Sequence, residues 1–398
     1  LFSIFRISVT PLLLLHCLSS SNSRIESDIP PSYLIHWIRR TPHSFRGFSL
    51  LTMSSLAAKK APTTDQIYDR QIRLWGATAQ AKMMNTTILY LHPTPILSEI
   101  AKNLVLAGLS CTLMSDRKLA RRDIQPMLFV DAKMVGMNAA EAMLENLQEL
   151  NPLATISADP RSFSSVPDGD FARYNIVVAD PTHMTQAEVK RLNGVTRANG
   201  SQLFLVSSFG FECCAFIDLG EKHKYRREVG KGELGDTVVD EFITFEEAIG
   251  VNMASLKNRF GDVDKSYVAW RSYIEHSEKS GSWPHDSSET SDFKTTVEEV
   301  LSSNSLPLDY IDSDTLSNIA YDELAVVNAV FGGVVGNEVI KAVSGRGEPA
   351  NNVLCFDGRK GAVKCTRVEA KKEKVAVPKA PSAPAQAQGG GDEVEIID

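Results

Sequence analysis

The sequence predicts an α/β protein built on an open, mainly parallel sheet, and three observations predict it. A strand, a helix and a strand follow one another between residues 86 and 114. Two further apolar strands flank a helical segment between residues 175 and 206, and an almost wholly apolar segment over 324–343 has the length of a buried helix. Strands that alternate with helices form βαβ units, which build parallel sheets of the dinucleotide-binding type.

Local patterns define each element in turn. The run Thr87–Leu91 is apolar and β-branched, as strands are, and the helix that follows is expected to end at Gly108, a residue suited to a helix C-terminus. Asn151-Pro152 should end a helix over 132–150, because proline has no N–H to donate. The remaining expected elements are a helix over 96–107, strands at 111–114, 175–179 and 203–206, helices near 185–198 and over 324–343, and a last strand at 352–357.

The predicted helix over 324–343 contains Gly332, Gly333 and Gly336. So apolar a helix must be buried, and its small residues permit another backbone to approach closely. Residues 221 to 318 are more polar and less periodic, with a Ser/Asp/Glu-rich stretch at 277–291. They predict an inserted, mostly helical half-domain that carries a loop.

The expected organisation has six parts. They are an upstream or targeting segment that is not folded at 1–52, a tail at 53–66, the first part of the α/β domain at 67–220, the inserted helical half-domain at 221–320, the closing part of the α/β domain at 321–368, and a disordered tail at 369–398. Residues 1–52 are set apart because the first methionine is Met53 and no lysine precedes it. The tail is set apart because it is rich in Pro, Ala, Gln and Gly.

Composition excludes several classes of function. Lys and Arg number 42 against 49 Asp and Glu, a net charge of −7, which argues against nucleic-acid binding through a basic field. The six cysteines form no CxxC pair and no Cys/His cluster at metal-ligand spacing, so we expect no metal site, no disulfide scaffold and a reducing compartment. The apolar run at 9–18 is too short to span a bilayer, and no membrane partner is expected.

Four segments carry a resemblance to a known family. The nine residues Tyr68–Gly76, sequence YDRQIRLWG, resemble the opening of the ubiquitin-like-modifier activating enzymes, the ThiF/MoeB-like family. Glu99–Gly108 resembles the helix after their first strand, and residues 209–221 resemble their crossover strand. Residues 332–358 resemble the closing segment of the smaller, non-catalytic (Aos-type) subunits of heterodimeric SUMO-activating enzymes. The resemblance implies a Rossmann-like adenylation domain.

The departures from that family are informative as well. Active members hold ATP phosphates on a Gly-rich turn after the first strand. The three glycine positions here hold His92, Pro95 and Leu97, with Pro93 beside them, so the resemblance implies that this chain binds no nucleotide alone. The catalytic cysteine is missing too, since Cys111, Cys213 and Cys214 fall within predicted strands. We expect all six thiols to be structural or incidental.

Arg70 is the candidate catalytic and cofactor-binding residue. In the family, this arginine comes from the inactive subunit and reaches the triphosphate of ATP in the active one. A guanidinium is always charged and binds phosphate oxygens in a bidentate manner, which lysine does poorly. From spacing alone, surface ion pairs of Arg70 and Arg73 at a helix start would be the favoured explanation, and it is the nine-residue resemblance that favours phosphate binding by Arg70.

The acidic segment Asp392–Asp398 is the second candidate site. Its Val394, Ile396 and Ile397, flanked by acids, resemble a SUMO-interacting motif, in which such residues add a strand to the modifier's sheet edge. A solvated acidic tail is an equally good explanation. The run Lys371–Lys374 permits nuclear import, although an exposed charge run is the commoner explanation.

The resemblance as a whole implies the regulatory subunit of a heterodimeric SUMO-activating enzyme, inactive alone, in the nucleus and cytoplasm. Its larger partner would hold ATP and Mg and supply the thioester-forming cysteine, and SUMO would be the modifier. The corresponding subunit of the neddylation-activating enzyme is one alternative, disfavoured because its helical insert is usually much longer. A nicotinamide-dependent oxidoreductase fits the βαβ pattern but not the lost glycines. A scaffold without catalytic contribution is the third alternative.

Overall fold

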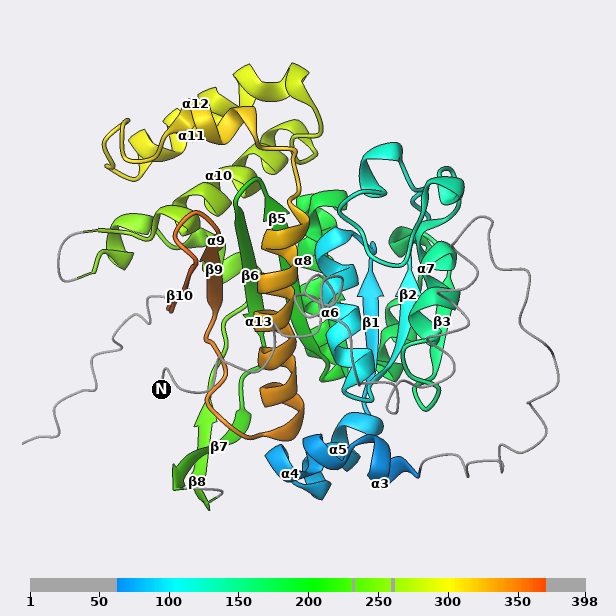
Figure 1. Cartoon of the computed structure of the whole chain (residues 1–398). Helices are drawn as coiled ribbons and strands as arrows, with labels where there is room; N and C mark the ends of the chain where they lie inside the picture. The colour runs from blue at the N-terminus through cyan, green and yellow to red at the C-terminus, as the bar shows by residue number, and fades with distance from the viewer. Residues whose placement is uncertain (1–62, 231–232, 259–261, 370–398) are drawn as a thin grey trace, which may run out of the picture. The chain divides into compact units, whose positions relative to one another are not determined.

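The computed structural model describes residues 63–369, apart from 231–232 and 259–261 (Figure 1). The described residues belong to one compact unit that begins at Pro62. The expectations for residues 1–52 and for the tail, including Val394, Ile396 and Ile397, lie outside the described residues.

An eight-stranded mixed sheet organises this unit, in the order β10-β9-β6-β5-β4-β1-β2-β3. Strands β1 to β5 are parallel to one another, while β6, β9 and β10 join as antiparallel neighbours. The strands are β1 (Thr87–Leu91), β2 (Ser110–Met114), β3 (Ile156–Asp159), β4 (Ile176–Ala179), β5 (Gln202–Phe209), β6 (Glu212–Asp218), β9 (Val353–Asp357) and β10 (Ala362–Thr366). The predicted open α/β fold is confirmed, and β10 adds an edge strand that the sequence analysis did not predict.

Helices cover both faces of the sheet. In β1, Ile88 and Tyr90 face one core with α6 (Pro95–Leu106) and α13 (Ala325–Ser344), whereas Leu89 and Leu91 face the other core with α8 (Gln186–Asn199). Successive side chains of a strand point to opposite faces, so a strand buried on both faces is apolar throughout. The other helices are α3 (Thr64–Ile67), α4 (Asp69–Trp75), α5 (Ala77–Met84), α7 (Ala139–Gln148), α9 (Phe245–Gly250), α10 (Lys265–Ser280), α11 (Thr290–Ser303) and α12 (Ser313–Asn318).

The predicted close approach of a second backbone to the long apolar helix is confirmed. A Cβ on Gly332 in α13 would lie 2.6 Å from the Cβ of Glu99 in α6, so only glycine permits this crossing. The expectation that α13 is wholly buried is wrong, because Val326 is 78% exposed and Val330 48%. In the described part of the chain, α13 is the one helix whose length and apolar composition would suffice to cross a membrane, and half of it is buried inside this fold.

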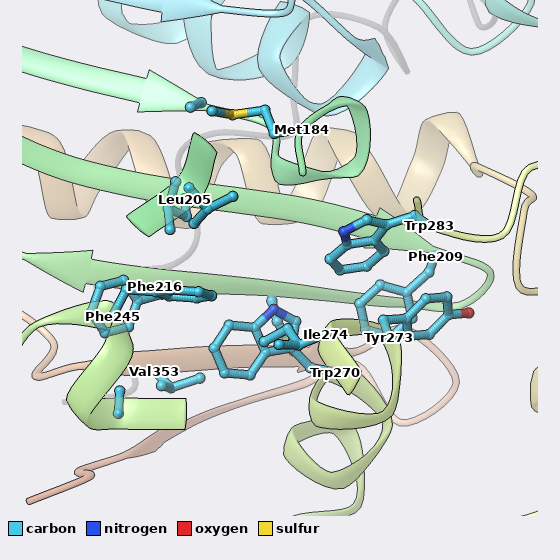
Figure 2. Packing of buried hydrophobic residues seen from close by; sticks show 14 of the residues in the cluster. Met184, Leu205, Phe209, Phe216, Phe245, Trp270, Tyr273, Ile274, Trp283 and Val353 are labelled. Atoms are coloured by element: carbon cyan, nitrogen blue, oxygen red, sulfur yellow. The ribbon is translucent and has the colours of Figure 1, made fainter. Parts of the chain in front are cut away.

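The insert is only partly as predicted. From Phe245 onward it is helical, but β7 (His223–Gly230) and β8 (Glu233–Asp240) pair as antiparallel strands, which we call the β7–β8 hairpin. The Ser/Asp/Glu-rich stretch at 277–291 is not one loop, because α10 continues to Ser280 and α11 begins at Thr290. Figure 2 shows how the insert packs on the sheet: Tyr273 of α10 lies 4.3 Å from Phe209 and 5.1 Å from Trp283, ring centre to ring centre.

The helix predicted over 132–150 begins later than expected. Only Ala139–Gln148 is α-helical, because the side chain of Asn138 caps it by accepting from the N–H groups of Ala140 and Glu141. The first N–H groups of a helix lack a carbonyl partner, and an asparagine before them supplies one, so Asn138 marks the start of this helix.

Candidate functional site

Helix α4 carries Arg70 and is anchored by two residues that flank this arginine, Tyr68 and Gln71. The buried hydroxyl of Tyr68 accepts a hydrogen bond from Nδ2 of Asn151 at 2.8 Å. The side-chain amide of Gln71 donates to the carbonyl of Leu106, the last residue of α6, at 3.2 Å. Gln71 thus holds the short helix against α6, and Tyr68 ties its start to Asn151, which follows α7, while Arg70 remains exposed.

Arg70 and Arg73 differ in their partners. Arg73 forms an ion pair with Asp69 at 3.0 Å, one helical turn away. Within the residues that the structure describes, the guanidinium of Arg70 has no hydrogen bond and no ion pair. The surface ion pair that the sequence allowed therefore explains Arg73 and leaves Arg70 unexplained. An unpaired guanidinium on an anchored helix can bind an anion of another molecule without first breaking a bond.

The turn between β1 and α6, where active relatives hold phosphates, is filled by its own side chains. His92 is buried in the left-handed region (φ 58°), and Pro95 occupies the first position of α6. The hydroxyl of Thr94 donates to the buried carboxyl of Asp180 at 2.7 Å. Arg117 donates to the carbonyl of Pro93 at 2.8 Å. Prolines remove donors and the other polar groups are occupied, so this turn does not fit a triphosphate. That the chain binds no nucleotide stays a prediction.

Buried and half-buried titratable groups surround that turn, and no sequence pattern indicated them. The rings of His92 and His183 lie 6.3 Å apart, and those of His183 and His285, from the insert, lie 6.2 Å apart. Burial lowers the pKa of all three. Burial, followed by the charge of Asp180, raises the pKa of Glu323 to about 8. These residues are distant in the sequence, and only the fold brings them together.

The described thiols are poor nucleophiles. Burial raises the pKa of Cys111 to about 12 and raises that of Cys213 further. The pKa of Cys365 is raised too, with burial as the main cause. Cys214 of β6 and Cys355 of β9 form a disulfide, contrary to the expectation of no disulfide. The pairing of β6 with β9 places these two residues opposite each other, and their spacing in the sequence does not reveal that pairing. A thiolate is the reactive form, so the raised pKa values disfavour Cys111, Cys213 and Cys365 as nucleophiles. That this chain lacks a catalytic cysteine stays a prediction.

Helix α13 presents a second exposed feature, the α13 stripe. It consists of the exposed residues on one side of the helix: Ala325, Val326, Ala329, Val330, Gly333 and Asn337. Their spacing of three and four residues places them on a single face. Five of these six residues have no polar side-chain atom, which is unusual for an exposed face and typical of a surface that another protein covers.

The fold is that of an adenylation-type α/β protein. It has a parallel sheet covered by helices, a crossover to antiparallel strands and an opening helix ahead of β1, and side chains fill the turn between β1 and α6. The chain belongs to the ThiF family, whose model matches residues 68–377. Three proteins named SUMO-activating enzyme subunit 1 are similar to it. That of Dictyostelium discoideum is 29% identical, covering 74% of this chain and 91% of that protein. That of Xenopus laevis is 27% identical (75% and 94%), and that of Homo sapiens 28% (74% and 92%).

Proposed function

We propose that this chain is the regulatory subunit of a heterodimeric SUMO-activating enzyme. The observation that carries the proposal is the similarity to proteins named SUMO-activating enzyme subunit 1 along more than nine-tenths of their length. The word "subunit" in those names implies a second chain. The neddylation alternative is not favoured by these relatives, and an oxidoreductase is not favoured by a turn that does not fit a pyrophosphate.

Three structural features support a role that needs a partner. The filled turn at His92–Pro95 leaves adenylation to another chain. The α13 stripe offers that chain an apolar surface to cover. Arg70 offers it a positive charge that has no partner among the described residues. In this proposal the larger subunit holds ATP and Mg and forms the thioester with SUMO, and the pair works in the nucleus and cytoplasm.

Arg70 is then a residue supplied in trans. As the C-terminal carboxylate of SUMO attacks the α-phosphate and pyrophosphate leaves, negative charge accumulates on phosphate oxygens. A guanidinium already positioned there stabilises that charge without reorganisation. The anchoring of α4 through Tyr68 and Gln71 provides the rigidity that such positioning requires.

Co-expression tests the proposal. The full chain should co-purify with the larger subunit of a SUMO-activating enzyme, and the pair should form a thioester with SUMO in the presence of ATP and Mg. Neither chain alone should do so. The larger subunit of the neddylation-activating enzyme, with its own modifier, is the matched comparison. Thioester formation by this chain alone, or only with the neddylation partner, would contradict the proposal.

A further inference from the structure

Residues of α5, of the end of α13 and of β7 and β8, elements labelled in Figure 1, line one pocket. This basic pocket has a volume of about 570 Å³. Four cations line it: Lys82, Lys224, Arg226 and Arg346. No carboxylate belongs to its described lining, although the chain as a whole carries a net charge of −7. Such a concentration of one sign in a concave surface attracts an anionic group.

Most of this positive charge is not neutralised by the described residues. Arg226 donates to the carbonyls of Gly235 and Leu234 at 2.7 and 2.9 Å, and Lys82 donates to the carbonyl of Ser344 at 3.2 Å. These bonds fix the side chains but leave their charges without a carboxylate. Lys224 has no side-chain partner among the described residues. Arg346 alone is paired, with Glu228 at 3.2 Å.

The pocket is also partly apolar. Trp75, Tyr225 and Leu234 lie between the cations in its lining. Its floor includes the first residues of α5, whose N-cap Gly76 supplies no side-chain acceptor for their N–H groups. The matching ligand therefore carries several negative charges interleaved with apolar side chains, which is a description of an acidic peptide rather than of a bare phosphate.

We propose that the acidic segment Asp392–Asp398 of this same chain docks in the basic pocket. The segment alternates carboxylates with branched apolar residues: Asp392, Glu393 and Glu395, then Asp398, interleaved with Val394, Ile396 and Ile397. The carboxylates meet the unneutralised cations, and the apolar side chains meet Trp75, Tyr225 and Leu234. This docking does not depend on the function proposed above.

The described chain ends near the basic pocket, which favours its own C-terminal segment over a separate peptide as the ligand of that pocket. Arg367 forms an ion pair at 3.1 Å with Asp240, the last residue of β8. Thr237, three residues earlier on β8, lines the pocket, about 10 Å away along the strand. Asp392 follows Glu369 by 23 residues, which is ample chain for that distance, because extended backbone covers about 3.3 Å per residue. Tethering at this range gives a millimolar effective concentration.

Carbodiimide coupling of the full chain tests the docking. The reagent joins carboxylates to amines that are already in contact. We expect the peptide containing residues 392–398 to be joined to Lys82 and Lys224, and less so at 0.5 M salt, which screens the charges. Lys222 is the matched control, because it lies two residues from Lys224 but outside the pocket lining. Coupling to Lys222 as often as to Lys224 would overturn the proposal, and so would coupling only between copies in a mixture of isotope-labelled and unlabelled chains.

A substitution gives an independent readout. The protease Glu-C cleaves after glutamate, so a docked segment should resist cleavage after Glu393 and Glu395. Lys224→Glu reverses an exposed charge that holds no described contact, and should accelerate that cleavage about five-fold by repelling the segment. Lys222→Glu should leave the rate unchanged. Equal cleavage of the unsubstituted chain and Lys224→Glu would overturn the docking, and circular dichroism would verify that both variants are folded.

Discussion

Gly108 lies directly against Tyr68, the residue that precedes α4. A Cβ added to Gly108 would stand 2.9 Å from the tyrosine hydroxyl oxygen. Gly108 also has a φ of +100°, which residues with a side chain rarely adopt. The residue at the end of α6 thus has to be glycine for Tyr68 to bond Asn151 and fix the start of the helix that carries Arg70.

Gly108→Ala should destabilise the protein by about 1–3 kcal/mol, because it combines backbone strain with a contact that requires Tyr68 to shift. The matched control is Gly194→Ala in the middle of α8, where a Cβ meets nothing within 4 Å. There alanine should stabilise by about 0.5–1 kcal/mol, since it is the better helix former. Urea unfolding of both variants gives the two free energies, and a loss at Gly194 equal to that at Gly108 would contradict the explanation.

The sequence alone predicted the helices and strands that have a recognisable pattern within their own residues. Strand β1 and helix α6 were predicted because an apolar strand and a glycine-terminated helix have clear patterns, and both were confirmed within one residue. The β7–β8 hairpin was not, because most of its residues are exposed on both faces and show no apolar alternation. Edge strand β10 was missed for the same reason, since it owes its conformation to pairing with β9.

The candidate site also has one part that the sequence predicts and other parts that only the fold reveals. Replacement of the phosphate-turn glycines by His92, Pro95 and Leu97 is visible in the sequence, because the positions are contiguous. The pairing of Arg73 with Asp69 is visible as a spacing of four residues on one helix. That Arg70 has no partner among the described residues is not visible, because residues distant in the sequence could have reached it. The basic pocket could not be predicted either, since Lys82 and Arg346 are brought together only by the packing of α5 against α13.

Substitutions at Arg70 should separate charge from geometry. In the heterodimer, Arg70→Ala should slow ATP–pyrophosphate exchange by about ten-fold to a thousand-fold, because one charge-stabilising group is lost from the transition state. Arg70→Lys should recover only part of the rate, since an ammonium cannot bind phosphate in a bidentate manner. Both variants should leave the amount of heterodimer on a sizing column unchanged.

Arg73→Ala is the control for Arg70. Its ion pair with Asp69 is exposed and is worth at most about 1 kcal/mol of stability, so exchange should continue at the normal rate. If Arg70→Ala exchanged as fast as Arg73→Ala, the chain would be a scaffold that contributes no catalytic group.

Glu323 predicts a specific dependence of stability on pH. Its pKa of about 8 in the folded chain exceeds the ordinary value of 4.5, so between these values the folded state holds a proton that the unfolded state has lost. Stability from this group is therefore full below about pH 4.5 and falls as pH rises to 8. Glu323→Gln should reduce the loss of stability between pH 7 and 9 by about 1 kcal/mol.

The three histidines around the turn between β1 and α6, His92, His183 and His285, oppose this trend only at lower pH, so the effect of Glu323 is measured from pH 7 to 9. Their lowered pKa values make the unfolded state bind more protons below about pH 6.5, so they favour folding as pH rises to that point. Glu141→Gln, an exposed residue in the first turn of α7, is the control and should keep the slope of the unsubstituted chain. Parallel slopes for Glu323→Gln and Glu141→Gln would show that Glu323 ionises normally.

The α13 stripe predicts where the partner chain binds. Val326→Asp should weaken the heterodimer at least about ten-fold, because it places a charge in the middle of an apolar surface that the partner would cover. The fold should be unaffected, since Val326 is 78% exposed and an acidic residue suits the first turn of a helix. Leu308→Asp, at a residue 59% exposed outside the stripe, is the control. Titration of the larger subunit against both variants measures the affinities, and equal affinities would place the interface on another surface.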